Sequence, residues 1–124
     1  MISHRVSLLI LVAPVVTMLK VFKGDIITVK KGEPIEIPAE ATGLPPPKVE
    51  WSKDEVIIAE PTETLLMETK EVNRMKVNST LSIPIAARKD KGTYTITASN
   101  RLGNASHTVT VMVLGEYYIC YLGI

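Results

Sequence analysis

The sequence has few of the residues that build metal centres, disulfide frameworks or aromatic binding surfaces. Its 124 residues include one cysteine and two histidines, and only 5% are aromatic. A single thiol, Cys120, cannot close an intrachain disulfide, and together with two distant histidines it cannot supply a structural zinc site. We therefore expect no metal site and no cofactor in this chain.

An excess of charge of one sign is also missing. Fourteen Lys and Arg residues against thirteen Asp and Glu residues leave a formal net charge of +1 at pH 7. A surface that binds nucleic acid usually shows as a basic excess, because it neutralises phosphates, and it often carries aromatic side chains for base stacking. Neither feature is present, so we expect no nucleic-acid partner. A hydrophobic content of 46% is typical of a globular chain, here of single-domain length.

The longest apolar run, residues 6–19, is too short to span a bilayer, which takes about 20 residues. We therefore expect no membrane partner. Two interpretations of this segment remain open. It is a signal peptide, or it is a leader of residues 1–13 followed by a first strand around Val15–Lys20. Pro14 interrupts the run and no Ala-x-Ala cleavage pattern follows it, which favours the leader.

From about Phe22 to Leu114, short strand-like runs are separated by turn residues. Apolar residues recur with a period of two in four places, which indicates strands with one buried face. These residues are Ile35, Ile37, Ala39, Ala41, Leu81, Ile83, Tyr94, Ile96, Ala98, Val109, Val111 and Val113. No stretch of ten or more residues carries a helical apolar stripe. The pattern predicts an all-β chain that folds as an antiparallel sandwich or barrel.

Three motifs occur together within these runs. Trp51 follows the proline-rich bend Gly43–Pro47, the stretch 81–83 reads L-x-I, and the stretch 90–103 reads D-x-G-x-Y-x-I-x-A-x-N-x-x-G. Over roughly Ala13 to Leu114, the chain resembles the intermediate-set (I-set) immunoglobulin domain. The matching positions are Gly32, Ala39, Gly43, Pro45, Pro47, Trp51, Leu81, Ile83, Asp90, Gly92, Tyr94, Ile96, Ala98, Asn100 and Gly103.

The resemblance implies an immunoglobulin-like antiparallel β-sandwich of the I-set Greek-key type over residues 14–114. It implies that the run Asp25–Lys30 pairs with the last strand, around His107–Val113. It also implies a tyrosine corner at Tyr94. The implied corner and turn residues are Gly43, Asp90, Gly92 and Gly103. The implied structural core contains Ile37, Ala39, Trp51, Leu81, Ile83, Tyr94, Ile96 and Ala98.

Both cysteine positions of the family pattern are replaced, by Ala39 and Ile96. A disulfide there would close a loop of about 57 residues, which the chain-entropy estimate values at about 4 kcal/mol. We expect packing of Ile96 over Ala39 against Trp51 to replace it. Because a disulfide does not persist in a reducing compartment, this replacement favours a cytoplasmic protein.

Within the family, the chain looks similar to the titin-type modules of muscle, with twitchin and the myosin-binding proteins as near relatives. The resemblance implies a non-catalytic structural and protein-interaction module of a giant sarcomeric protein, which bears mechanical load in the cytoplasm of the sarcomere. It implies thick-filament proteins and neighbouring immunoglobulin or fibronectin modules as protein partners. No motif supplies a nucleophile, a base and an oxyanion donor together, so we expect neither enzymatic activity nor catalytic residues.

The alternative is a secreted or cell-surface immunoglobulin domain used in adhesion or receptor binding. Two glycosylation sequons, Asn78-Ser79-Thr80 and Asn104-Ala105-Ser106, are compatible with it. The last residues, 115–124, form an apolar, tyrosine-rich tail that fits neither interpretation. They extend the last strand, pack across one end of the sandwich, or are a non-native chain ending.

Overall fold

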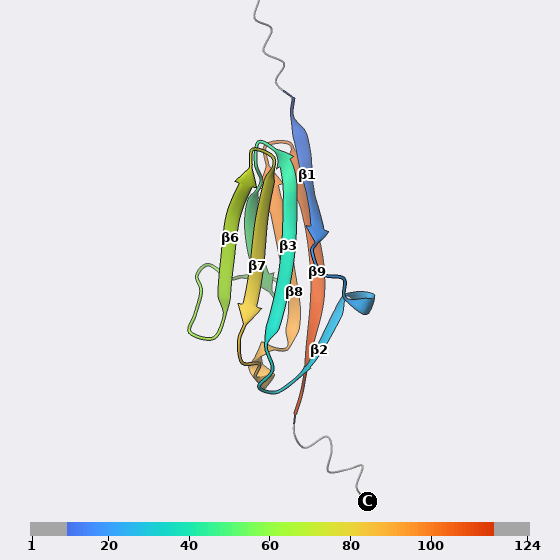
Figure 1. Ribbon diagram of the computed structural model, residues 1–124, viewed down its shortest axis with the longest axis vertical. Coiled ribbons are helices and arrows are strands. Elements are labelled where there is room, and N and C mark those ends of the chain that lie inside the picture. Colours follow the sequence, from blue (N-terminus) through green and yellow to red (C-terminus); the bar gives the residue numbers. More distant parts are fainter. Residues whose placement is uncertain (1–9, 116–124) are drawn as a thin grey trace, which may run out of the picture.

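The computed structural model describes residues 10–115, which form two β-sheets packed face to face (Figure 1). The elements are β1 (Val12–Met18), η1 (Lys23–Asp25), β2 (Ile26–Lys30), β3 (Ile35–Leu44), β4 (Lys48–Lys53), β5 (Val56–Ile57), β6 (Leu66–Asn73), β7 (Lys76–Ile83), η2 (Arg88–Asp90), β8 (Gly92–Asn100) and β9 (Gly103–Leu114). The sheets have the strand orders β1-β3-β7-β6 and β2-β9-β8-β4-β5. The alternation predicts an antiparallel sandwich or barrel, and the structure is the sandwich, with one parallel pair, β2 and β9.

The hydrophobic core lies between the two sheets and is filled by alternate residues of the central strands. In β3 every second residue from Ile35 is buried, and in β7 every second residue from Val77, because successive side chains of a strand point to opposite faces. The eight residues expected in the core from the sequence are each 3% exposed or less: Ile37, Ala39, Trp51, Leu81, Ile83, Tyr94, Ile96 and Ala98.

The first strand begins earlier than the sequence predicts. β1 covers Val12–Met18 rather than Val15–Lys20, so Ala13 and Pro14 lie inside the strand instead of ending a leader. β1 is an edge strand, and its register against β3 shifts between residues 12 and 15. Proline is tolerated at edges and irregularities of this kind because its missing N–H leaves no ladder bond broken. Residues 1–9, the first part of the expected leader, lie outside the described residues.

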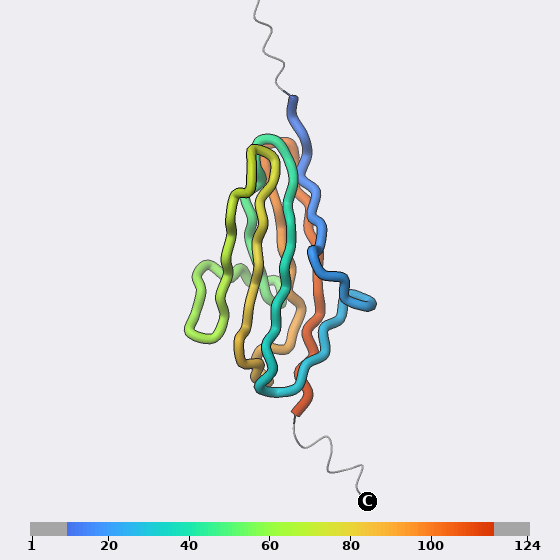
Figure 2. The backbone as a smooth tube through the Cα atoms, viewed as in Figure 1, coloured from blue at the N-terminus to red at the C-terminus, as the bar shows by residue number. Residues whose placement is uncertain are grey.

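After β1 the chain crosses from the four-stranded sheet to the five-stranded sheet through η1. Gly24 and Asp25 both have positive φ there, 64° and 55°. β2 then runs parallel to the C-terminal half of β9, with Ile26 opposite Thr110 and Lys30 opposite Leu114. The pairing implied by the resemblance is therefore present. The tube in Figure 2 shows that the described chain enters at one end of the sandwich and leaves at the other.

Candidate functional site

A buried hydrogen bond from Trp51 joins the two sheets. The indole Nε1–H of Trp51, on β4, donates to Ser79 Oγ on β7 at 2.8 Å, and the hydroxyls of Ser79 and Thr69 are 2.8 Å apart. Ser79 is only 1% exposed, so it provides a protein partner where water does not reach the indole. The sequence analysis did not predict this role of Ser79, although Ser79 alternates with Val77 and Leu81 and so faces inward like them.

Apolar side chains occupy the two positions where the family pattern has cysteines. Ala39 and Ile96 are buried in the same core cluster as Trp51, and Ile96 is directly opposite Trp51 in the β4–β8 register. Hydrocarbon packing therefore fills the space between the sheets at this level. Cys120, the chain's single cysteine, lies outside the described residues.

The tyrosine corner connects β8 to the turn before it. The Tyr94 hydroxyl donates to the carbonyl of Asp90 at 2.5 Å, and the Asp90 carboxylate accepts the N–H of Ala87 at 2.8 Å. Burial, with smaller effects from the charges of Asp90 and Asp54, raises the pKa of Tyr94 well above its ordinary value. The phenol is thus held neutral as a hydrogen-bond donor.

Gly92 allows the turn between β4 and β5 to approach the start of β8. Its φ is 151°, and a Cβ at this position would lie 2.8 Å from Asp54 Oδ2. Asp54 Oδ1 accepts the backbone N–H of Thr93 at 2.9 Å and its hydroxyl at 3.2 Å. The backbone hydrogen bond from Thr93 is the main cause that lowers the pKa of the Asp54 carboxyl. Asp54 is a second structural residue that sequence reasoning missed.

Asn100 organises the end of the sandwich at which β1 begins. Its Nδ2 donates to the carbonyls of Val12 at 2.9 Å and Pro45 at 3.1 Å, so it joins β1 to the β3–β4 loop. Gly43 lies against this contact, where an added Cβ would be 3.2 Å from Asn100 Nδ2. Gly103, with a φ of 150°, forms the adjoining β8–β9 turn. Of the turn residues expected from the sequence, Gly43 and Gly103 therefore lie at this end, whereas Asp90 and Gly92 lie at the other end of β8.

A shallow pocket of about 770 Å³ opens beside these loops. Its walls come from the start of β1, the β3–β4 loop and the β6–β7 turn, and include Ile10, Leu11, Pro45 and Met75. Glu71, Asn73 and Arg74 add polar groups on the β6–β7 side. This lining offers no nucleophile beside a base.

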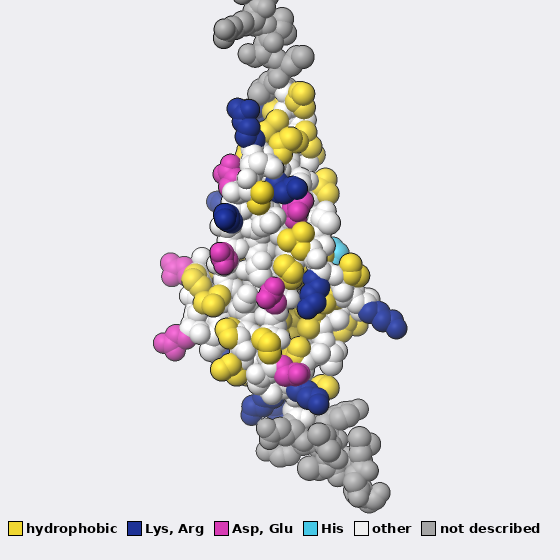
Figure 3. Space-filling view, viewed as in Figure 1, with side chains coloured by type: hydrophobic (Ala, Val, Ile, Leu, Met, Phe, Trp, Pro, Cys, Tyr) yellow, Lys and Arg dark blue, Asp and Glu magenta, His cyan; other side chains and the backbone are white. Residues whose placement is uncertain are grey.

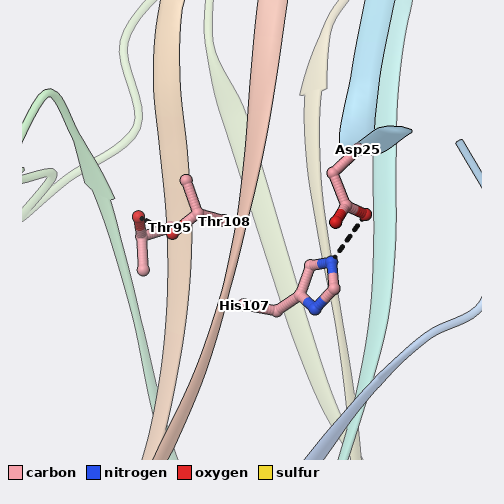
Figure 4. Close-up of polar contacts among 4 residues, drawn as sticks. All are labelled: Asp25, Thr95, His107 and Thr108. Carbon is pink, nitrogen blue, oxygen red and sulfur yellow. Dashed lines mark hydrogen bonds and ion pairs between the residues drawn. The ribbon is translucent and has the colours of Figure 1, made fainter. Parts of the chain in front are cut away.

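His107 and Asp25 join β9 to the crossover between the sheets. His107 Nε2 lies 2.9 Å from Asp25 Oδ1, at the end of η1 (Figure 4). On the opposite side of β9, the hydroxyls of Thr108 and Thr95 are 2.8 Å apart (Figure 4). The contact between His107 and Asp25 fixes the point where the chain joins β2. The sequence places His107 on the last strand but does not predict this partner.

The described residues hold neither a cluster of metal-ligating side chains nor a helix that could span a membrane. Over residues 10–115, no three His, Cys, Asp or Glu side chains converge to hold a metal ion. In the same range, no helix is long and apolar enough to cross a membrane.

Comparison with known proteins identifies relatives of two kinds. The family model described as "Immunoglobulin I-set domain" matches residues 21–113. The human "Neural cell adhesion molecule L1-like protein" is 37% identical over 87 residues, which are 70% of this chain and 6% of that protein. The human "Myosin-binding protein C, slow-type" is 33% identical over 88 residues, 71% of this chain and 7% of that protein. The chain thus spans less than a tenth of the length of these relatives.

A solved structure shows the same fold. The crystal structure of the titin M10–obscurin-like 1 immunoglobulin complex contains a chain that is 25% identical to this one, with a TM-score of 0.64. The match covers 83% of this chain and 96% of that chain.

Proposed function

The chain belongs to the immunoglobulin I-set family, and from that premise we propose that it is a load-bearing, protein-binding module of a giant sarcomeric protein. The fold is an immunoglobulin-like sandwich, and its similarity to titin and myosin-binding protein C supports a protein-interaction module. Domains of this fold generally bind rather than catalyse. The proposed domain covers residues 14–114, with Val12 and Ala13 added by β1.

The arrangement of β2 and β9 is the observation that carries the mechanical part of the proposal. The chain enters and leaves at opposite ends of the sandwich (Figure 1), so a pulling force acts along the strands. β2 and β9 run parallel over five residue pairs, and the Lys31 N–H donates to the Leu114 carbonyl at 3.0 Å just beyond them. Hydrogen bonds between strands pulled in this direction are loaded in shear and break together.

A backbone substitution at Lys31 tests this mechanism. Lys31→Pro removes the donor to Leu114, and because Lys31 is exposed it leaves the core intact. We expect a lower unfolding force when single molecules are pulled from both termini. Thr62→Pro is the control, because it removes a backbone donor, to the Leu65 carbonyl, and the hydroxyl that accepts the Leu65 N–H, from a loop outside the β2–β9 pair. An unchanged force for Lys31→Pro, or an equal loss for Thr62→Pro, would contradict the proposal.

The proposed location is the cytoplasm of the sarcomere, with thick-filament proteins and neighbouring immunoglobulin or fibronectin modules as partners. The apolar residues Ala39 and Ile96 support this location, since a domain that holds its sheets together without sulfur is suited to a reducing compartment. Cosedimentation of the chain with purified thick filaments tests the partner. Recovery of the chain only in the supernatant would contradict it.

A secreted or cell-surface adhesion domain is the second candidate, favoured by the 37% identity to the L1-like adhesion molecule. The two glycosylation sequons differ in exposure. Asn104 is exposed at the start of β9, whereas the sequon of Asn78 includes the buried Ser79. After expression of the whole chain in mammalian cells, a glycan at Asn104 that Asn104→Gln removes would support this candidate. A cytosolic, unmodified product would support the sarcomeric one.

A further inference from the structure

The crossover between the two sheets, residues 19–25, packs loosely against the sandwich. Leu19 is 49% exposed, Val21 is 92% exposed, and no residue of η1 is buried. Phe22 is partly buried against the core. The space-filling view shows basic side chains and scattered apolar ones on the side where the crossover leaves the sandwich (Figure 3). Segments with few buried apolar contacts open locally at a low free energy, so polar contacts matter for keeping this segment closed.

The last residue of the crossover, Asp25, has a left-handed backbone. Its φ is 55°, in a region that residues other than glycine adopt uncommonly, although aspartate tolerates it better than most. The residue before it, Gly24, has a φ of 64°. A conformation of this kind persists where the surrounding structure holds it. The turn directs the Asp25 carboxylate toward β9, as Figure 4 shows.

The side chain of His107 holds Asp25 from β9. His107 Nε2 lies 2.9 Å from Asp25 Oδ1, and the two side chains are 32% and 53% exposed. The contact joins the crossover to β9 immediately before β2 begins at Ile26. Because both side chains reach the solvent, their charges follow the pH of the solution.

The strands around His107 bring few other charges to it. Over their described lengths, β1 and β8, which both pack against β9, contain no Lys, Arg, Asp or Glu, and β9 itself contains none. η1 adds Lys23 beside Asp25. The charged residues of β2 and η2 that lie along β9, Lys30 and Arg88, are at its C-terminal end. Asp25 is therefore the acid that a charged His107 faces.

We propose that His107 and Asp25 form a proton-sensitive latch, which fastens the crossover to β9 more tightly when His107 is protonated. Imidazole side chains ordinarily gain a proton between about pH 8 and 5, whereas aspartate carboxylates stay charged down to about pH 4. Acidification between these limits adds Coulomb attraction to the existing hydrogen bond. It also places a proton on both ring nitrogens, so Nε2 is then a donor whichever tautomer the neutral ring prefers. The crossover should therefore open less often as pH falls.

The inference goes beyond the proposed function, because the latch acts in a single chain without load. Its outcome is separate from that of the mechanical proposal, which depends on backbone bonds between β2 and β9. A chain without a proton-sensitive crossover leaves the expected effect of Lys31→Pro unchanged.

Amide hydrogen exchange of the whole chain tests the latch. The N–H groups of Asp25 and Ile26 donate to the carbonyls of Phe22 and Lys23, so their protection factors report opening of the crossover. These factors are corrected for the effect of pH on intrinsic exchange. We expect both to be about two- to fivefold larger at about pH 5.5 than at about pH 7.5, the factor that an exposed ion pair supplies. The Thr62 N–H, hydrogen-bonded in the β5–β6 loop on the other side of the sandwich (Figure 1), should show no such difference.

Two latch variants each remove one charge of the pair. Asp25→Asn retains a residue that tolerates the left-handed backbone, and His107→Gln retains a hydrogen-bond donor that gains no proton. Each should give equal protection factors at the two pH values. His4→Gln, which removes the other histidine of the chain, is the matched control and should retain the difference.

Circular dichroism shows whether each variant is folded, and if one latch variant is not, the other decides, because either one removes the ion pair. Equal protection of Asp25 and Ile26 at both pH values in the unmodified chain would overturn the proposal. A difference that persists in a folded latch variant would do the same.

Discussion

Removal of the Ser79 hydroxyl should destabilise the domain, because it leaves the indole N–H of Trp51 without a partner. Ser79→Ala deletes the oxygen that accepts this N–H at 2.8 Å and that also bonds to Thr69. Trp51 is 3% exposed and Ser79 is 1% exposed, so water cannot replace the lost acceptor without a rearrangement of the core. A buried donor left unsatisfied costs about 1–3 kcal/mol.

We therefore expect Ser79→Ala to lower the free energy of unfolding by about 2 kcal/mol, which corresponds to roughly 8–16 °C in melting temperature for a domain of this size. Trp51 is the only tryptophan in the chain, so its fluorescence during urea unfolding reports directly on the affected site. Thr69→Val removes the second hydroxyl but leaves the bond between Trp51 and Ser79, and should cost about 0.5–1.5 kcal/mol.

The matched control is Ser82→Ala, which removes the same atom from the outer face of the same strand. It should change the free energy of unfolding by less than about 0.5 kcal/mol, as most surface substitutions do. If Ser79→Ala is no more destabilising than Ser82→Ala, the buried hydrogen bond between the sheets does not stabilise the fold, and the reasoning is refuted.

Three other predictions follow from the turns and the tyrosine corner. In urea unfolding, Gly92→Ala should lower the free energy of unfolding more than Gly24→Ala. Both glycines have positive φ, but only at Gly92 would an added Cβ lie close to another atom, 2.8 Å from Asp54 Oδ2. If both substitutions lower the free energy of unfolding equally, the close approach of Asp54 to Gly92 is contradicted. Folding raises the pKa of the Tyr94 hydroxyl. Above about pH 10 the unfolded chain therefore loses the phenol proton while the native chain keeps it. The free energy of unfolding should then fall as pH rises, by up to about 1.4 kcal/mol per pH unit. Tyr94→Phe should have a shallower slope between about pH 10 and 11.5, and an identical slope would contradict a buried neutral phenol. Asn100→Ala should cost about 1–3 kcal/mol and speed amide exchange at Leu102, since the Asn100 side chain accepts the Leu102 N–H at 2.8 Å. Unchanged exchange at Leu102 would contradict that role.

Alternation of apolar residues predicted the central strands because each of them has one fully buried face. β3, β7 and β8 show this pattern along most of their length, and β9 shows it at Val109 and Val111. β6 does not, because it is an edge strand whose inward positions include Thr69 and Glu71, and its sequence carries no apolar period. The start of β1 was misplaced for a related reason. Pro14 signals a break in a sequence, yet an edge strand with a shifted register accommodates it.

The polar contacts could not be predicted because their partners are far apart in the chain. Trp51 and Ser79 are 28 residues apart, and Asp25 and His107 are 82 residues apart. The way the two sheets face each other brings the first pair together, and the pairing of β2 with β9 within one sheet brings the second pair together. For the first pair the sequence offers one signal, because Ser79 stands among apolar residues at an inward-facing position of its strand. A buried indole N–H needs an acceptor, and Ser79 can supply one. The second pair has no comparable signal.

Two sheets face each other around Trp51, with apolar packing of Ala39 and Ile96 at the positions where the family pattern has cysteines. The most direct measurement is oxidation of the Ala39→Cys, Ile96→Cys double variant, made in a Cys120→Ser background so that only one pairing is possible. We expect an intramolecular disulfide, seen by mass spectrometry and thiol titration, that raises the urea midpoint. Two thiols that stay free in a folded chain under oxidising conditions would contradict the claim.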